Sequence, residues 1–290
     1  IKHQKQPPKE NNNPINPIFA IGERNSGTNM LYNALCDCYG DNNVMDKFAR
    51  DKHWLQDEYV FKSERTIKRK ILDIYKSRKY TIFISVRGVF NWVAAMNARP
   101  YEMPAHAVSQ VRDNMTRFIL HPWAMKRPKN DIKKKDCQGN FPSPEYVVPC
   151  IDYRGIYELN SFNGGKPYKN ILDFRAAKMR NYLNMTTWNP KVVFIKLEEY
   201  YRKPRDVLKK IEEAVGAKCK ITKSFEIDFK KTKVNKMSMR VDPLFTYKSK
   251  KLSNGNYDIS KSNINLIKIL TDWKVEKAIG YRMIDLVPQL

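Results

Sequence analysis

Three short apolar runs, each followed directly by a helical pattern, constrain the fold of this chain more than any other feature. The runs are rich in β-branched and aromatic residues and lie at 18–21, 81–86 and 192–197. Helical patterns follow them through about Tyr39, over 90–98 and over 204–215. Such runs are typical of strands buried in a parallel sheet, and strands that each lead into a helix place helices on both faces of that sheet. We therefore expect an α/β fold, a single domain with a central parallel β-sheet flanked by helices.

The rest of the chain is arranged around this predicted core. Residues 1–17 are polar and contain four prolines, which indicates a flexible N-terminal lead-in or stem before a domain at 18–290. Further helical stretches are expected around 105–120 and 170–185. Residues of about 126–169 are rich in Pro, Gly and Lys, and we interpret them as a loop-rich insertion that faces the substrate. No stretch approaches the roughly 20 apolar residues that cross a bilayer, so no membrane segment is predicted in this chain.

The chain is strongly basic. Fifty-four Lys and Arg residues against 30 Asp and Glu residues give a formal net charge of +24. Such a charge attracts polyanions, whether nucleic acid, acidic glycan, anionic lipid or a multiply phosphorylated ligand, and does not choose among them. An AT-biased genome would also produce many of these lysines. The sequence has no helix-turn-helix, zinc-finger or RNP-like pattern, which argues against nucleic acid as the partner.

The five cysteines do not form a metal-binding pattern. They include no pair of CxxC motifs and have no histidine cluster beside them, so we predict no metal site. Cys137 and Cys150 flank a Pro-rich stretch. These two residues either form a disulfide, if the compartment is oxidising, or remain free thiols.

The loop after the first predicted strand has the features of a phosphate-binding turn. Gly22 and Gly27 enclose a segment with an arginine and a serine, and Thr28-Asn29 open the following helix. Backbone N–H groups at a helix N-terminus bind anions. The Gly-x4-Gly spacing is that of a nucleotide P-loop, but Thr28-Asn29 stands where that motif has Lys and Ser/Thr. The loop therefore suits a single phosphate and argues against a kinase or ATPase.

Four segments together resemble one enzyme family. A strand, the pattern Arg-x-Ser-Gly-Thr-x and a helix resemble the 5′-phosphosulfate loop of sulfotransferases that use 3′-phosphoadenosine-5′-phosphosulfate (PAPS). The second strand ends in Arg87 and continues into 88–96, which is similar to the family's 3′-phosphate segment. Residues 194–216 are similar to the family's strand, Tyr-Glu-Asp, Pro, helix and Leu-Gly stretch. Glu276-x3-Gly280-Tyr281 matches a common family ending. The resemblance covers about 18–285 and implies a P-loop-like sulfotransferase fold.

The resemblance also implies roles for residues that would bind the cofactor. Those in the first loop would bind the 5′-phosphate through backbone and hydroxyl donors; they are Asn25, Ser26, Gly27, Thr28 and Asn29. Arg24 would neutralise the sulfonate or the bridging oxygen. Arg87 would bind the 3′-phosphate, the alternative being a strand-end arginine in a surface ion pair. The basic stretch 230–240 would close over the 3′-phosphate.

A histidine after the first helix is the candidate general base. His53 follows Lys52 at a place where the family often has a Lys/His element in the cleft, although a purely structural histidine is an equal alternative. Lys52 would be a sulfonate-binding cation or one of many surface lysines. His106 and His121 are substitutes for the base.

Two further cations lie on the helical stretch 173–184. Arg175 and Lys178 either face the cofactor or lie on a solvated helix face, and we expect the solvated face.

Three residues depart from the family pattern. Asn25 stands where relatives usually have the Lys or Arg of the loop, with Arg24 one residue early. Ala95 replaces a serine that binds the 3′-phosphate in many relatives, and Met30 replaces an aromatic residue near the adenine. The departures imply a divergent branch and leave open a non-catalytic member.

The expected function is therefore transfer of the sulfuryl group from PAPS to an acceptor hydroxyl, by in-line displacement with a general base and without a metal. We expect the acceptor to be a glycan or a small-molecule alcohol, with a protein tyrosine as a further alternative. The compartment stays open between the Golgi lumen, for a truncated type II membrane protein, and the cytoplasm. The alternatives are a non-catalytic polyanion- or nucleic-acid-binding protein and a P-loop kinase-like nucleotide enzyme.

Overall fold

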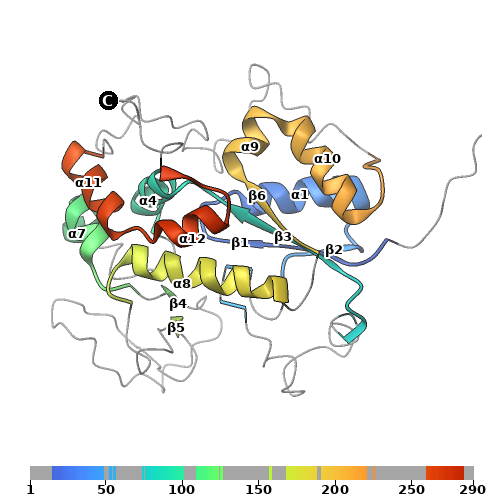
Figure 1. The fold of residues 1–290 in the computed structure, drawn as a ribbon, viewed down its shortest axis with the longest axis horizontal. Coiled ribbons are helices and arrows are strands. Elements are labelled where there is room, and N and C mark those ends of the chain that lie inside the picture. Colours follow the sequence, from blue (N-terminus) through green and yellow to red (C-terminus); the bar gives the residue numbers. More distant parts are fainter. Residues whose placement is uncertain are drawn as a thin grey trace, which may run out of the picture.

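A four-stranded parallel sheet lies at the centre of the protein (Figure 1). The structure is a computed structural model that describes residues 15–48, 52–53, 55–56, 74, 76–100, 109–123, 125–126, 157–158, 168–187, 191–220, 225 and 259–283. The strands follow the order β2-β1-β3-β6 and are β1 (Ile18–Gly22), β2 (Val44–Met45), β3 (Thr81–Val86) and β6 (Val192–Lys196). All three pairings are parallel, with Ile18 opposite Thr81 and Ile82 opposite Val192. The predicted parallel α/β sheet is confirmed.

Helices are found where the sequence predicts them after the first two strands, within 105–120 and 170–185, and over 204–215, and the structure adds helices at 197–202, 261–270 and 273–278 that the sequence did not predict. The helices are α1 (Thr28–Tyr39), α4 (Val89–Ala98), α6 (Ser109–Arg112), α7 (Met115–Leu120), α8 (Ile171–Asn184), α9 (Leu197–Arg202), α10 (Pro204–Val215), α11 (Lys261–Leu270) and α12 (Trp273–Ala278), with a 3-10 turn at Met185–Thr187. The third strand is shorter than the predicted run 192–197: it ends at Lys196, because Leu197 already begins α9.

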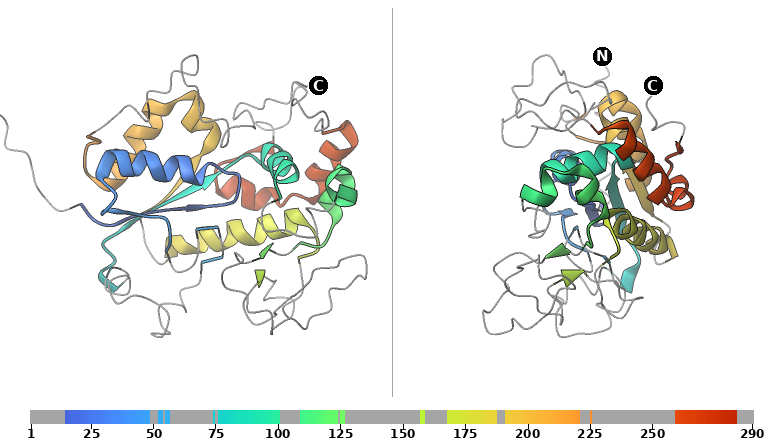
Figure 2. Two further views of the ribbon diagram at one scale, coloured as in Figure 1. Left: turned by 180° about the vertical axis from the view of Figure 1, so that it is seen from behind. Right: turned by 90° about the vertical axis from the view of Figure 1, so that its left-hand side faces the viewer.

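Alternate residues of each strand face opposite layers of helices. Ile18, Ala20, Phe83 and Ile195 pack with α1 and α10 on one face. Their neighbours along the strands, such as Phe19 and Ile84, pack with α8 and α12 on the other. Figures 1 and 2 show α1 and α8 on opposite sides of the sheet. This two-residue alternation is what strand geometry requires, and burial on both faces of β1 and β3 explains why these strands are mostly apolar.

A third apolar cluster lies beyond the carboxyl end of the sheet. It joins α4, α7, α8 and α11 around large aromatic side chains, among them Trp92, Phe118, Trp123 and Phe174. Figure 1 shows α7 and α11 side by side next to α4. This cluster anchors α4, the helix that begins directly after Arg87.

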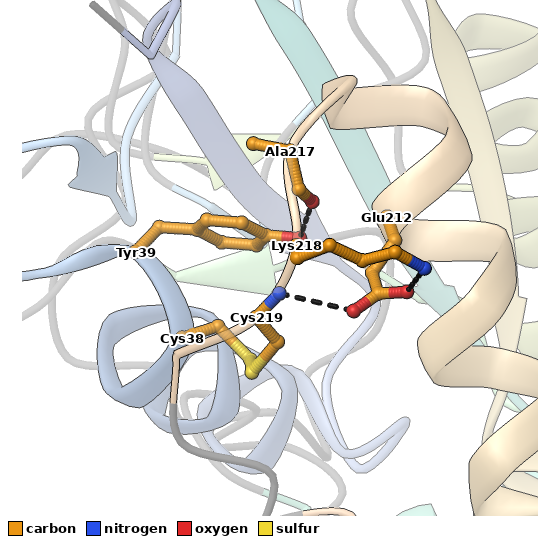
Figure 3. Close-up of a disulfide and its surroundings, with 6 residues drawn as sticks. All are labelled: Cys38, Tyr39, Glu212, Ala217, Lys218 and Cys219. Carbon is orange, nitrogen blue, oxygen red and sulfur yellow. Dashed lines mark hydrogen bonds and ion pairs between the residues drawn. A yellow bond between two sulfur atoms is a disulfide. The ribbon is translucent and has the colours of Figure 1, made fainter. Parts of the chain in front are cut away.

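A disulfide joins two distant parts of the chain. Cys38, in the last turn of α1, is bonded to Cys219, which follows α10 (Figure 3). The bond is supported by hydrogen bonds from Tyr39 Oη to the Ala217 carbonyl (3.2 Å) and from the Cys219 N–H to Glu212 (3.0 Å). The sequence did not reveal this pair, because its members lie 181 residues apart.

Several sequence expectations fall on residues that the structure does not describe. These are the pair Cys137 and Cys150, most of the stem, and most of the insertion. At the start of the insertion, β4 (Met125–Lys126) pairs antiparallel with β5 (Tyr157–Glu158), which lies within it. None of the helices in the described ranges is long and apolar enough to span a membrane.

Candidate functional site

The β1–α1 loop needs glycine at both ends. Gly22 has φ 155°, and a Cβ there would overlap the Ser85 carbonyl on the neighbouring strand β3. Gly27 has φ 87°, and a Cβ there would lie 2.5 Å from Leu197 Cδ1. Any other residue would therefore push the loop away from β3 and α9. The Gly-x4-Gly spacing has a steric cause in this fold.

The hydroxyl groups of the loop are turned inward. Ser26 Oγ lies 2.7 Å from the Glu23 carbonyl and 2.9 Å from the Ser85 carbonyl, and Thr28 Oγ1 donates to Glu23 O (3.2 Å). Ser85 Oγ donates in return to the Ser26 carbonyl. The expectation that these hydroxyls contribute to phosphate binding therefore needs correction, because they hold the loop in shape. The backbone remains as the source of donors.

The N-terminus of α1 presents those backbone donors. Gly27, the N-cap residue, contributes no side-chain cap, and the Leu31 N–H donates to the Gly27 carbonyl (3.0 Å). The N–H groups of 28–30 precede this bond and have no partner within the helix. Asn29 is exposed at this end. A helix of 12 residues with such an end favours an anion through its N–H groups and its dipole.

Arg87 lies against the same loop. It leaves the end of β3, is only 4% exposed, and donates from Nη1 to the Asn25 carbonyl (3.3 Å). This burial contradicts the alternative of a surface ion pair. The first turn of α4 holds the loop as well, because Trp92 Nε1 donates to the Arg24 carbonyl (2.9 Å). Two segments predicted to bind phosphate, far apart in sequence, thus meet at the carboxyl ends of neighbouring parallel strands, where open α/β sheets bind ligands.

The Lys52-His53 segment is pinned to the end of β1. The Gly22 N–H donates to the Lys52 carbonyl (2.9 Å), and His53 Nδ1 lies 2.9 Å from the Gly22 carbonyl. Because a carbonyl oxygen can only accept, this contact assigns the ring proton to Nδ1. His53 Nε2 is then the proton-accepting nitrogen, which is the tautomer that a general base needs.

The environment of His53 keeps the ring neutral. Burial, together with the nearby charge of Arg24, lowers the pKa of His53 to about 3. Lys178 Nζ donates to the His53 carbonyl and adds a second cation. Lys52, in contrast, forms an ion pair with Asp46 (3.1 Å), so its charge is largely compensated. Lys178 is therefore a buried cation beside His53 in addition to Lys52.

Arg175 and Lys178 are buried, so the expectation of a solvated helix face is wrong. They are 1% and 2% exposed. The physical reason is their spacing on α8, since Arg175 lies four residues after Ile171 and Lys178 four after Phe174, both on the buried face. The same spacing is the sequence signal that could have placed them inside.

Arg175 binds three partners at once. Nη1 contacts Glu23 Oε2 (2.5 Å), Nε contacts Glu276 Oε1 (2.6 Å), and Nη2 donates to the Arg87 carbonyl (2.7 Å). Its guanidinium also lies 4.9 Å from the centre of the Trp92 ring. Burial alone would lower the pKa of Arg175, but the two carboxylates outweigh it and raise the pKa, so Arg175 stays charged.

Glu23 is a site residue that sequence reasoning missed. Its side chain is 1% exposed, and among the residues that the structure describes its Oε1 has no hydrogen-bond partner. Burial raises its pKa to about 7, although the charge of Arg175 opposes the shift. A carboxyl group that changes charge near neutral pH thus lies under the β1–α1 loop.

The other candidates do not join this cluster. His121 is the C-cap residue of α7, which packs on α4, α8 and α11, and burial lowers its pKa to about 4. His106 and the stretch 230–240 lie outside the described residues. Within the described ranges, no group of His, Cys, Asp and Glu could hold a metal ion.

The comparisons with known proteins add no relative. The chain matches no protein-family model, no curated protein and no solved structure. The site itself combines a helix N-terminus, two arginines and a neutral histidine around one loop, an arrangement suited to a ligand with separate anionic groups.

Proposed function

We propose that this protein is a PAPS-dependent sulfotransferase that acts on an acceptor hydroxyl. One observation carries the proposal: Arg87, the N-terminus of α1 and His53 all converge on the β1–α1 loop. A ligand with a 5′ group and a 3′-phosphate needs two anion sites a short distance apart, and a hydroxyl acceptor needs a base beside them.

The residues around the loop fit such a cofactor. The N–H groups at the start of α1 would hold the 5′-phosphate, Arg24 the sulfonate, and Arg87 the 3′-phosphate. When bound, the cofactor would supply the activated sulfuryl group. The loop lacks the lysine of a nucleotide P-loop, which favours this assignment over an ATP enzyme.

His53 would accept the proton of the acceptor hydroxyl. Its Nδ1–H is engaged by the Gly22 carbonyl, so Nε2 is the basic atom. With a pKa of about 3, His53 is neutral at physiological pH. Anionic groups bound beside it would raise this pKa and so strengthen the base as the site fills.

The net charge of the chain is relevant to the acceptor, and the disulfide is relevant to the compartment. A net charge of +24 suits an anionic glycan, while a small-molecule alcohol remains the alternative acceptor. The Cys38–Cys219 disulfide supports an oxidising compartment such as the Golgi lumen, because disulfides seldom persist in the cytosol.

Ligand-induced thermal stabilisation tests the cofactor. At about 100 times its dissociation constant, 3′-phosphoadenosine-5′-phosphate should stabilise the wild-type protein by roughly 2.7 kcal/mol. Arg87→Ala should lose this shift, whereas Arg205→Ala, an exposed arginine on α10, should keep it. A shift with ATP and magnesium instead would favour the kinase-like alternative. No nucleotide shift, combined with steeply salt-dependent polyanion binding, would favour the polyanion-binding alternative.

An activity assay with His53→Asn completes the test. The asparagine amide can still donate to the Gly22 carbonyl but has no basic nitrogen, so nucleotide binding should persist while turnover falls by about 10²- to 10⁴-fold. Unchanged turnover would exclude His53 as the base.

A further inference from the structure

The two predicted phosphate-binding segments are joined beneath the site by one buried guanidinium. Arg175 reaches Glu23 at the start of the β1–α1 loop and the carbonyl of Arg87 at the end of β3. Its third partner, Glu276, lies on α12 and binds it through both carboxylate oxygens, at 2.6 and 3.0 Å. Three parts of the chain therefore depend on one side chain for their relative positions.

The Arg87–Gly88 peptide is held from its other side as well. The Gly88 N–H donates to Glu198 Oε1 (2.9 Å), and Tyr281 Oη donates to Glu198 Oε2 (2.6 Å). The carbonyl and the N–H of one peptide group thus both bind charged side chains, Arg175 and Glu198. Hydrogen bonds to charged groups are stronger than neutral ones.

We propose that Arg175 is a positioning residue that couples the β1–α1 loop to the Arg87–Gly88 peptide, and that Glu198 holds the second of these segments. The inference rests on the proposed function, because it assigns the segments to the 5′ and 3′ groups of the cofactor. Arg175 touches neither group and acts through the backbone that binds them.

The chemistry of the cluster supports positioning over simple stabilisation. A buried ion pair often stabilises a fold no more than apolar residues of the same volume would. A guanidinium offers a planar fork of donors in fixed directions, and here three of its nitrogens meet three different segments. Lysine has one nitrogen and cannot make the same set of contacts.

Nucleotides with a single phosphate can test the two segments one at a time. Adenosine 5′-monophosphate reports on the β1–α1 loop, adenosine 3′-monophosphate on Arg87, and 3′-phosphoadenosine-5′-phosphate on both. Arg175→Lys should lower the affinity for both monophosphates by roughly tenfold, which corresponds to the free energy of one charged hydrogen bond. Glu198→Ala should lower the affinity for adenosine 3′-monophosphate only.

Matched variants control for general damage. Glu198→Gln should restore binding, because its amide oxygen can still accept from the Gly88 N–H. Glu212→Ala should leave all three affinities unchanged, since Glu212 also accepts from a backbone N–H, that of Cys219, beside the disulfide. If Arg175→Lys does not fold, Arg175→Met combined with Glu276→Gln replaces it, because the double variant removes the guanidinium without leaving Glu276 as an unpaired buried charge.

The outcomes separate this proposal from the proposed function. Loss of affinity for both monophosphates supports coupling, and loss for one or neither overturns it. If the wild-type protein binds none of the three nucleotides, the proposed function fails, and amide hydrogen exchange then decides the coupling. Faster exchange in both 24–28 and 88–92 of Arg175→Lys would uphold it, and unchanged exchange in either segment would overturn it.

Discussion

At the scale of single residues, burial decides the chemistry of this site more than charge does. Glu23 lies against Arg175, yet burial raises its pKa to about 7. When Glu23 is protonated, the positive charge of Arg175 and the negative charge of Glu276 balance. When Glu23 is ionised, the cluster has one buried negative charge in excess, and the positive charge of Lys178 offsets part of this excess. His53 follows the same rule in the other direction, since burial keeps it neutral.

The Glu23 pKa predicts a pH-dependent stability. A carboxyl group whose pKa is raised in the fold stabilises the protein fully below its ordinary value of 4.5, and this contribution is lost as the pH rises through about 7. Glu23→Gln should therefore exceed the unfolding free energy of the wild type by less than about 1 kcal/mol at pH 5 and by about 3 kcal/mol at pH 8. Chemical denaturation from pH 5 to 8 measures this, with Glu213→Gln on the exposed face of α10 as the control. Parallel curves for the wild type and Glu23→Gln would contradict the assignment.

At the scale of elements, the site depends on how α1 begins. Gly27 combines a left-handed backbone with close contact to Leu197 at the start of α9. A Cβ at Gly27 would force the Leu197 side chain to move, in addition to the strain of the left-handed backbone. The presentation of the α1 N–H groups follows from this single backbone conformation.

Two glycines with nearly the same φ test this point. Gly27→Ala should destabilise the fold by about 1–3 kcal/mol more than Gly40→Ala, because both changes strain a positive φ but only the first creates a clash. Gly40, at the C-terminal end of α1, has nothing within 4 Å of its Cβ position. Thermal unfolding measures the difference, and equal losses would mean that the Leu197 contact does not constrain the loop.

At the scale of the whole molecule, two sets of contacts hold together segments that are distant in the sequence. The Cys38–Cys219 disulfide joins α1 to the end of α10, and Arg175 joins α8 to α12 and to the β1–α1 loop. The disulfide restricts the conformations of the unfolded chain, and the contacts of Arg175 set the geometry of the site.

Removal of the disulfide should destabilise the protein without changing the site. Cys38→Ser should lower the unfolding free energy by about 2–4 kcal/mol, since the bond closes a long loop of the unfolded chain. Cys36→Ser, which removes a free thiol on the same helix, should have a much smaller effect. Chemical denaturation with and without reductant measures this loss. If reductant does not change the unfolding free energy of the wild-type protein, the disulfide does not contribute to its stability.

Local patterns determined the elements of this protein. Apolar runs such as 81–86 can be buried only as strands between helices, and the positions of Pro204 and Gly216 delimit α10, because these signals depend on neighbours in the chain. They also located Arg24 and Arg87 beside the ends of strands, whereas His53 was singled out by the family resemblance and its contact with the end of β1 appears only in the structure. Only the tertiary structure decided the rest: that the hydroxyls of Ser26 and Thr28 face inward, that Arg175 is buried between Glu23 and Glu276, and that Cys38 meets Cys219. These contacts join residues through packing across the sheet, and no spacing in the sequence encodes which distant charges will meet once water is excluded.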